Sequence, residues 1–247
     1  MKPLIMCPTA FLVLVAVACI PARAEFIVDQ DMTIDGRIDD DVSVIEGASP
    51  PTTLNLVDPA SLGEYLRVYD SSIVHMSGGT VDERLYAYGT SVIHISGGLL
   101  LEDLVADDLS TANVSGGDLS DYVIVRGFGT ANIVGGTIWG VAAYADGSAD
   151  ISGGLINAWP QETGLIATGS STISIRGTGF NYPYGKIPDA SGTLTGTLAD
   201  GTSIHTGFNI TADGAIVLVP EPIVFALLLP CLFVVAAYAV RQRKAAD

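Results

Sequence analysis

Hydrophobic and polar residues alternate along much of the chain in short runs. A period of two with one apolar face is typical of a β-strand that is buried on one side. In one set of runs, two apolar residues are separated by a single residue, so both would point to the same face of a strand. These pairs are Val74/Met76, Ile93/Ile95, Ala112/Val114, Ala131/Ile133, Ala149/Ile151 and Ile173/Ile175. A second short strand is predicted upstream of each pair, at Leu66–Val68, Leu85–Ala87, Leu104–Ala106, Val123–Val125, Val141–Ala143 and Leu165–Ala167.

Glycine pairs mark the period of the pattern. They occur at 78–79, 97–98, 116–117, 135–136 and 153–154, so the chain repeats itself every ~19 residues. A sixth, eroded copy begins at Thr172 after a short insertion, and Leu54–Leu56 is an earlier copy without glycines. Because glycine readily adopts positive φ, each pair predicts a sharp corner. A third apolar point follows each pair, at Val81, Leu100, Leu119, Ile138 and Ile156.

A repeat of this length, with two or three short strands, cannot enclose a core alone, whereas stacked repeats bury their faces against one another. We therefore predict an all-β fold, a parallel β-solenoid of the right-handed β-helix type, with roughly six or seven coils. The alternative is a Greek-key sandwich with turns roughly every 8–12 residues. Glycines at one fixed phase of the repeat favour the solenoid.

The period divides the chain into segments. Residues 53–178 are predicted to form the repeats, and residues 25–52 an N-terminal cap whose acidic run at 39–41 discourages edge pairing. Residues 179–219 are predicted to form a small C-terminal β cap, with strands near 192–198, 203–205 and 214–219. Asp-Gly turns at 200–201 and 213–214 are expected to join these strands.

The N-terminus has the order of a secretory signal peptide. Lys2 is followed by an apolar run over 4–20, and then by a small-x-small cleavage site formed by Ala22 and Ala24. We expect removal of residues 1–24. The alternatives are a membrane anchor, for which the run is only marginally long, and lipoprotein cleavage before Cys19, for which the preceding residues lack the usual leucine.

The C-terminus has the pattern of a membrane-spanning helix. Residues 223–240 contain no charge, and at a rise of about 1.5 Å per residue they approach the thickness of a bilayer core. Basic residues follow at once, so the positive-inside rule places residues 25–219 outside the cytoplasm. The alternative, a buried core helix, would leave the basic end without solvent.

Three consecutive features of this terminus form a recognisable signal: a Pro-Glu-Pro motif, the apolar run and a basic end. The residues are Val219, Pro220, Glu221, Pro222, Arg241, Arg243 and Lys244. Over residues 219–244 the chain resembles the PEP-CTERM sorting signal of bacterial exported proteins, and over about 53–177 it resembles PEP-CTERM repeat proteins with Ser-Gly-Gly coils. The resemblance implies recognition by an exosortase-type sorting enzyme, loss of the tail, and delivery from the inner membrane to the cell surface or an extracellular polysaccharide matrix.

Charge excludes one class of partner. Residues 25–219 contain six basic and 25 acidic residues, a net charge of −19. This surface would repel nucleic acid, and also acidic polysaccharides unless cations bridge them. All three cysteines lie in the predicted leader or tail, so no disulfide framework or thiol nucleophile is expected in the exported part.

Equivalent polar positions of the repeat predict a polar ladder on one outer face. Its members are His75, His94, Asn113, Asn132 and Asp150. The two histidines would stack about 4.8 Å apart, either as a metal or proton site or simply as part of the ladder. No third ligand is evident, which favours the ladder.

Two further features suggest binding. Tyr69, Tyr88 and Tyr144 share one outward column, with Asp107 and Arg126 between them, and could stack on sugar rings or only shield the sheet. The sequence Asp29-Gln30-Asp31 with Asp35 is similar to a calcium loop, but Ile34 and Asp40 stand where an EF-hand requires glycine and glutamate. No cofactor is predicted, and weak Ca²⁺ binding is the alternative.

The function predicted from these features is that of a surface or matrix protein that makes structural contacts and is not an enzyme. No catalytic, cofactor-binding or metal site is predicted. One alternative is a β-helix enzyme that degrades polysaccharides, although the six basic residues are scattered and no motif singles out a pair of acids. The other alternative is a calcium-dependent adhesin.

Overall fold

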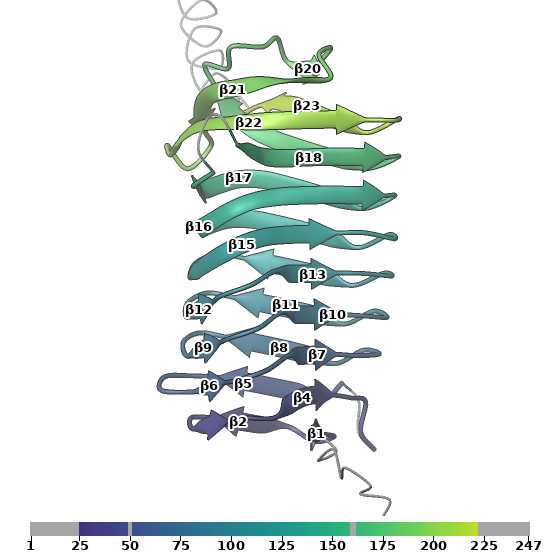
Figure 1. The fold of residues 1–247 in the computed structure, drawn as a ribbon, viewed down its shortest axis with the longest axis vertical. Coiled ribbons are helices and arrows are strands. Elements are labelled where there is room, and N and C mark those ends of the chain that lie inside the picture. Colours follow the sequence, from purple (N-terminus) through teal and green to yellow (C-terminus); the bar gives the residue numbers. More distant parts are fainter. Residues whose placement is uncertain (1–24, 49–50, 159–161, 222–247) are drawn as a thin grey trace, which may run out of the picture.

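The computed structural model describes residues 25–48, 51–158 and 162–221. Every regular element in this part is a strand, which confirms the predicted all-β class. The strands lie in layers stacked along the long axis, from the N-terminal layers in purple to the C-terminal layers in yellow-green (Figure 1). The predicted leader and the apolar run at 223–240 lie outside the described residues.

Three parallel ladders run along the stack. The first contains β1 (Glu25–Val28), β4 (Asp41–Val44), β7 (Leu66–Val68), β10 (Leu85–Ala87), β13 (Leu104–Ala106), the second part of β15 (Asp118–Val125), the end of β16 (Thr130–Ala145), β18 (Thr163–Gly169) and β22 (Ser203–Thr211). The second contains β2 (Met32–Ile34), β5 (Thr53–Leu56), β8 (Ile73–Met76), β11 (Val92–Ile95), β14 (Thr111–Val114), the start of β16, the start of β17 (Ser148–Ile156), β19 (Thr172–Thr178) and β23 (Ala215–Pro220). The third contains β3 (Arg37–Ile38), β6 (Ser61–Leu62), β9 (Thr80–Val81), β12 (Leu99–Leu100) and the remaining parts of β15, β16 and β17.

The pairing register equals the sequence period in the middle of the stack. Leu85 pairs with Leu104 and Val92 with Thr111, so each residue lies beside its equivalent in the next repeat. Each of these middle layers thus supplies one strand, or one part of a longer strand, to each ladder. The inward positions of all layers form one continuous core; Leu85, Ile93 and Leu100, all from one layer, are at most 1% exposed.

The N-terminal segment 25–52 adds strands to the same ladders. Glu25 of β1 pairs with Asp41 of β4, a step shorter than the repeat, and Val42 of β4 pairs with Leu66 of β7, a longer step. The segment expected to cap the stack therefore supplies its first layers. The corner loops of these first layers differ in length. The strands therefore stay in register although the sequence shows no constant period there.

At the C-terminal end, β22 and β23 continue the parallel ladders, while β21 (Ser191–Leu198) and β20 (Gly185–Lys186) pair antiparallel with them. The predicted turn at 200–201 joins β21 to β22, with Gly201 at a φ of +90°. The predicted turn at 213–214 is also present and joins β22 to β23, with the N–H of Gly214 donating to the carbonyl oxygen of Thr211 at 3.2 Å. The two strands do not form a hairpin, because they enter different ladders, and Ala212 in the turn has a positive φ.

The glycine pairs form one corner of each layer, for two different physical reasons. The second glycine of each pair has a φ between +77° and +90°. The first glycine has ordinary φ but lies against the previous layer: a Cβ on Gly97 would be 2.5 Å from the carbonyl oxygen of Ser77, and one on Gly135 equally close to that of Ser115. A side chain at either position therefore conflicts with the layer spacing.

Aspartates bind the second glycine of the pair at the first and the last of these glycine corners. The N–H of Gly79 donates to Asp58 Oδ1 at 2.7 Å, and that of Gly154 donates to Asp200 Oδ2 at 2.8 Å. Burial acts to raise the pKa of Asp200, but hydrogen bonds from Gly154 and Thr202 outweigh it and hold the pKa below its ordinary value. Both carboxylates satisfy a backbone donor at a glycine corner.

A second corner uses buried serines. The hydroxyls of Ser91, Ser110 and Ser171 donate to carbonyl oxygens of the preceding layer at 3.3, 3.1 and 2.8 Å. Ser72 occupies the equivalent place and is also fully buried, but its hydroxyl has no partner among the described residues. The corner therefore contains a natural comparison between a satisfied and an unsatisfied serine.

We expect Ser110→Ala to lower the free energy of unfolding by about 1 kcal/mol, because it leaves the carbonyl of Ala87 without this donor. Ser72→Ala removes an unpaired buried hydroxyl and should change stability by less than about 0.5 kcal/mol, or increase it. Urea unfolding midpoints of both variants measure the difference. Equal losses in the two variants would contradict this account of the corner.

Candidate functional site

The structure brings the polar ladder together on the outer face of the second ladder. The registers align Asn55, His75, His94, Asn113, Asn132, Asp150 and Ser174. The two imidazole rings are stacked, with centroids 4.8 Å apart and planes at 11°. Asn132 donates to Asn113 at 3.0 Å, and Arg176 makes a two-pronged contact with Asp150, with its closest N–O distance at 2.6 Å. The ladder is thus joined by ring stacking at the histidines and by one amide–amide hydrogen bond, and Arg176 pairs with its acidic member.

The stacked histidines have poor geometry for holding one metal ion. A shared zinc ion requires the lone pairs of two ring nitrogens to point at one centre about 2.1 Å away. The lone pair of an imidazole nitrogen lies in the ring plane, and planes at 11° hold the two sets of lone pairs nearly parallel to one another. The residues that the structure describes contain no group of three or more histidine, cysteine, aspartate or glutamate side chains placed to hold a metal.

The histidine pair predicts a pH dependence of stability. Burial, and then the neighbouring His75, lower the pKa of His94 from its ordinary value of 6.5. The folded state therefore favours the neutral ring of His94. The contribution of this ring to the free energy of unfolding is fully present above pH 6.5 and is lost as the pH falls through the lowered pKa. We expect the difference in unfolding free energy between pH 7.5 and 5.5 to shrink in the His75→Asn/His94→Asn double variant. Urea unfolding at both pH values measures this difference, and His205→Asn is the control. An unchanged difference in the double variant would contradict the prediction.

Tyrosines form a cluster on the outer face of the first ladder. Tyr69 and Tyr88 stack with centroids 5.2 Å apart and planes at 13°. Tyr86 lies 5.7 Å from Tyr88 at 10°, and Tyr65 lies 6.1 Å from Tyr86. Tyr144 lies further along the stack and is 37% exposed. Because Tyr69, Tyr86 and Tyr88 stack on one another, much of their ring surface is already in contact with protein.

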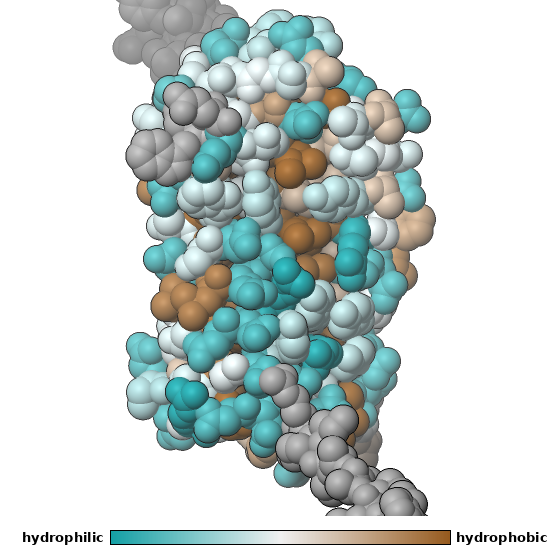
Figure 2. All heavy atoms as spheres, viewed as in Figure 1, coloured by the Kyte–Doolittle hydropathy of each residue, from teal (hydrophilic) through white to brown (hydrophobic). Residues whose placement is uncertain are grey.

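Arginine–aspartate pairs border the tyrosine cluster and link adjacent layers. Their closest N–O distances are 2.9 Å for Arg67–Asp41, 2.8 Å for Arg84–Asp103 and 2.6 Å for Arg126–Asp107. Arg67 also lies over Tyr65, 4.7 Å from the ring centroid. Three of the six basic residues between positions 25 and 219 thus lie on this face. The face in view in Figure 2 is accordingly hydrophilic at its centre, with separate hydrophobic residues between.

One acid of this face has an unusual environment. Asp103 is 8% exposed. Burial, and then the charge of Asp121, raise the pKa of Asp103, while Arg84 opposes the shift. The sequence pattern did not single out Asp103, Arg84, Tyr65 or Tyr86, because each differs in type from its neighbours in the repeat. The alternation of inward and outward residues could have identified Tyr86, because it lies two residues before Tyr88 and therefore points to the same outer face.

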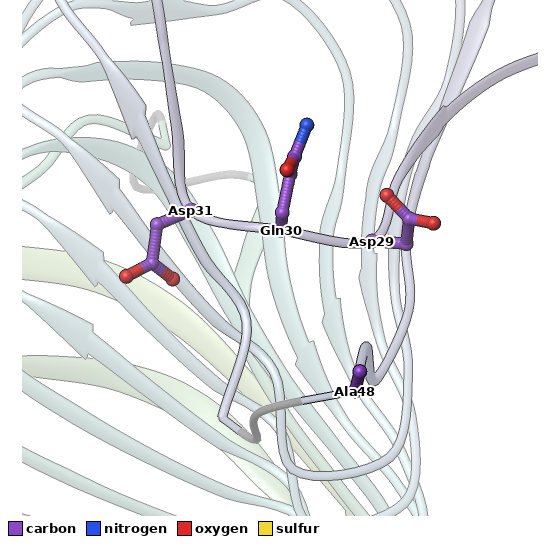
Figure 3. Close-up of a pocket in the computed structure, with 4 residues that line it drawn as sticks. All are labelled: Asp29, Gln30, Asp31 and Ala48. Carbon is purple, nitrogen blue, oxygen red and sulfur yellow. The ribbon is translucent and has the colours of Figure 1, made fainter.

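The acidic N-terminal loop lines a recess of about 530 Å³ formed by Asp29, Gln30, Asp31 and Ala48. Figure 3 shows the carboxylates of Asp29 and Asp31 on opposite sides of the backbone, with Gln30 between them. One oxygen of Asp31 accepts a hydrogen bond from the backbone N–H of Thr53 at 2.8 Å. Asp35 follows β2 and does not line the recess. The arrangement does not gather these oxygens around one point.

The predicted sorting motif begins within the last strand of the structure. Val219 and Pro220 are the last residues of β23 and pair with Arg176 and Gly177 of β19. Glu221 is the last described residue. The other predicted processing residues lie outside the described part: Ala22, Ala24, Pro222, Arg241, Arg243 and Lys244.

Comparison with protein-family models, with curated proteins and with solved structures finds no match to this chain. Within residues 25–48, 51–158 and 162–221, no helix is long and apolar enough to span a membrane.

Proposed function

We propose that the exported part is a parallel β-solenoid of the right-handed β-helix type. The support is the pairing pattern: three ladders, parallel throughout the repeats, in which partners in the middle of the stack are equivalent residues of successive repeats. A Greek-key sandwich would instead pair its strands antiparallel. Among the described strands, every antiparallel pair includes β20 or β21, at the C-terminal end of the stack.

We propose that the protein works at the cell surface or in the extracellular matrix as a structural and contact-making module. The leader and the Pro-Glu-Pro tail support export through the inner membrane and recognition by an exosortase-type enzyme. The mature chain would then run from Glu25 to about Val219. Its interior needs no disulfide, because one continuous core extends through all the layers.

The observation that carries this role is the self-pairing of the outer faces. The polar ladder, the tyrosine cluster and the arginine–aspartate pairs all join one layer to the next. These contacts stabilise a long acidic rod and leave few convergent reactive groups. Such a body is suited to display and contact, with its strongly negative net charge disfavouring nucleic acid and other polyanions.

A polysaccharide-degrading enzyme is the second candidate, and Asp103 is the observation that favours it. A buried acid with a raised pKa beside a second acid is a feature of general acid catalysts in glycoside hydrolysis. However, Arg84 already forms an ion pair with Asp103 at 2.8 Å, which favours a structural use. Release of reducing ends from a panel of glycans, lost in Asp103→Asn, would support the enzyme.

Mass spectrometry of the protein recovered from the cell surface and the culture matrix tests the principal proposal. The expected mature chain begins at Glu25, ends close to the Pro-Glu-Pro motif and carries any group transferred to it. A chain retained in the cytoplasm with both ends intact would overturn the proposal.

A further inference from the structure

Beyond the N-terminal layers, the repeat is interrupted where β15, β16, β17 and β18 pair. Leu119 pairs with Ile138 at the full period, but Tyr122 pairs with Gly140, one position short of it. Ser120 and Asp121 therefore lie opposite the single residue Trp139, which is a β-bulge. In the next layer Ile138 pairs with Ile156 but Val141 pairs with Leu165, so extra residues are inserted between Ile156 and Leu165. Bulges and insertions in otherwise regular sheets commonly re-aim side chains at functional sites.

A recess of about 250 Å³ lies at this break, on the outer face of the third ladder. It is lined by Asp118, Leu119, Ser120, Thr137, Trp139 and Asn157. Four polar residues of different types thus share the lining of the recess with Trp139. Within the described residues, the side chains of Asp118, Ser120, Thr137 and Asn157 have no hydrogen-bond partner, in contrast to the paired asparagines and threonines of the neighbouring columns.

Tyr122 anchors the backbone beside Trp139. Its hydroxyl donates to the carbonyl oxygen of Thr163 at 2.6 Å. Its ring packs closely on Gly140, because a Cβ there would lie 2.7 Å from Tyr122 Cε1. The bulge and these two contacts therefore hold the strand segment that carries Trp139 before any ligand arrives. Such preorganisation lowers the cost of binding.

The lining chemistry selects among ligands. A sugar ring has apolar C–H groups that pack on an aromatic ring, and hydroxyls that both donate and accept hydrogen bonds. Asp118 supplies acceptors, Asn157 supplies a donor and an acceptor, and the hydroxyls of Ser120 and Thr137 supply either. Among the described residues, the lining contains no lysine, arginine or histidine to compensate a carboxylate, sulfate or phosphate on the ligand, and Asp118 would repel one.

We infer that the recess around Trp139 is a binding site for one pyranose unit of an uncharged glycan. The inference adds a ligand class to the proposed surface role and rests on that role only for where the glycan is met. It assigns Trp139 as the stacking platform and Asp118 and Asn157 as the groups that bind ring hydroxyls. Tyr122 is assigned as a positioning residue that packs on Gly140, next to Trp139.

The test uses the full chain, purified in detergent, with the Trp159→Phe substitution so that Trp139 is the only tryptophan. The probes are gluco-, galacto- and manno-oligosaccharides and, as the charged counterpart, oligogalacturonate. We expect at least one neutral series to change the Trp139 fluorescence in a saturable way, and oligogalacturonate to bind at least about tenfold more weakly. Calorimetry with Trp139→Ala and Asp118→Ala should each show affinity lowered about tenfold or more.

Phe128→Ala is the matched control. Phe128 is an aromatic residue 63% exposed at a different corner, and its loss should leave affinity unchanged. Thermal unfolding of each variant establishes that the fold is kept. Three results would each overturn the inference: no saturable response to any neutral oligosaccharide, equal binding of oligogalacturonate, or unchanged binding by Trp139→Ala. Mass spectrometry of the mature chain is independent of these titrations, so failure of the glycan site and failure of the surface role are distinguishable.

Discussion

Gly97→Ala is expected to lower the free energy of unfolding by about 3 kcal/mol, because the new Cβ would lie 2.5 Å from the carbonyl oxygen of Ser77 in the layer below. The contacting atom belongs to the backbone of a strand ladder, so it cannot move without disturbing the spacing of the layers. For a chain of this size the midpoint of thermal unfolding should fall by roughly 10 °C. Circular dichroism during heating and urea unfolding measure both quantities.

Two other glycines separate the causes. Gly201→Ala meets no atom within 4 Å but has a φ of +90°, so only backbone strain of about 1–2 kcal/mol is expected. Gly36→Ala has neither positive φ nor a neighbour within 4 Å, and should change stability by less than about 0.5 kcal/mol. If Gly97→Ala proved as stable as Gly36→Ala, close approach of the layers could not be the reason for the first glycine of each pair.

Replacing Pro220, Glu221 and Pro222 together with alanine is expected to abolish removal of the C-terminal tail. The resemblance to PEP-CTERM proteins makes this motif the recognition element, and proline also keeps the chain extended and non-helical, as a protease requires. Mass spectrometry of the protein from the membrane fraction should then show the tail through Asp247, and the surface fraction should be depleted of it.

The control for this variant is Pro183→Ala/Pro188→Ala, which changes two exposed prolines outside the motif and should leave processing normal. Because Pro220 pairs with Gly177, thermal unfolding must also show that the triple variant keeps its last layer. Normal tail removal in a folded triple variant would refute recognition of Pro-Glu-Pro.

The sequence predicted the central features well because the strands stack in parallel and in register. Residues one repeat apart in the sequence are therefore neighbours in space. The period marked by the glycine pairs was enough to place His75 beside His94 and Tyr69 beside Tyr88. The same reasoning identified the corners, because positive φ at the second glycine of a pair is a local property of the backbone.

Features that break or cross the period were not predictable in this way. The first layers were hidden because the steps from β1 to β4 and from β4 to β7 are shorter and longer than the repeat. The buried serine corner was missed because each hydroxyl bonds to a carbonyl oxygen of another layer, which no alternation pattern reveals. The recess at Trp139 depends on the bulge between β15 and β16 and on the insertion before β18. The intervals between glycine pairs did not show where in the repeat either change lies.

The stacking of equivalent layers also makes the protein's length adjustable in fixed steps. In the middle of the stack each layer pairs only with the layers before and after it, through identical registers. Deleting or duplicating one repeat unit, such as residues 92–110, would leave the remaining registers unchanged and alter the height of the rod by about 4.8 Å. Duplication of repeats would therefore set the length of the rod in fixed steps, without a new fold being required.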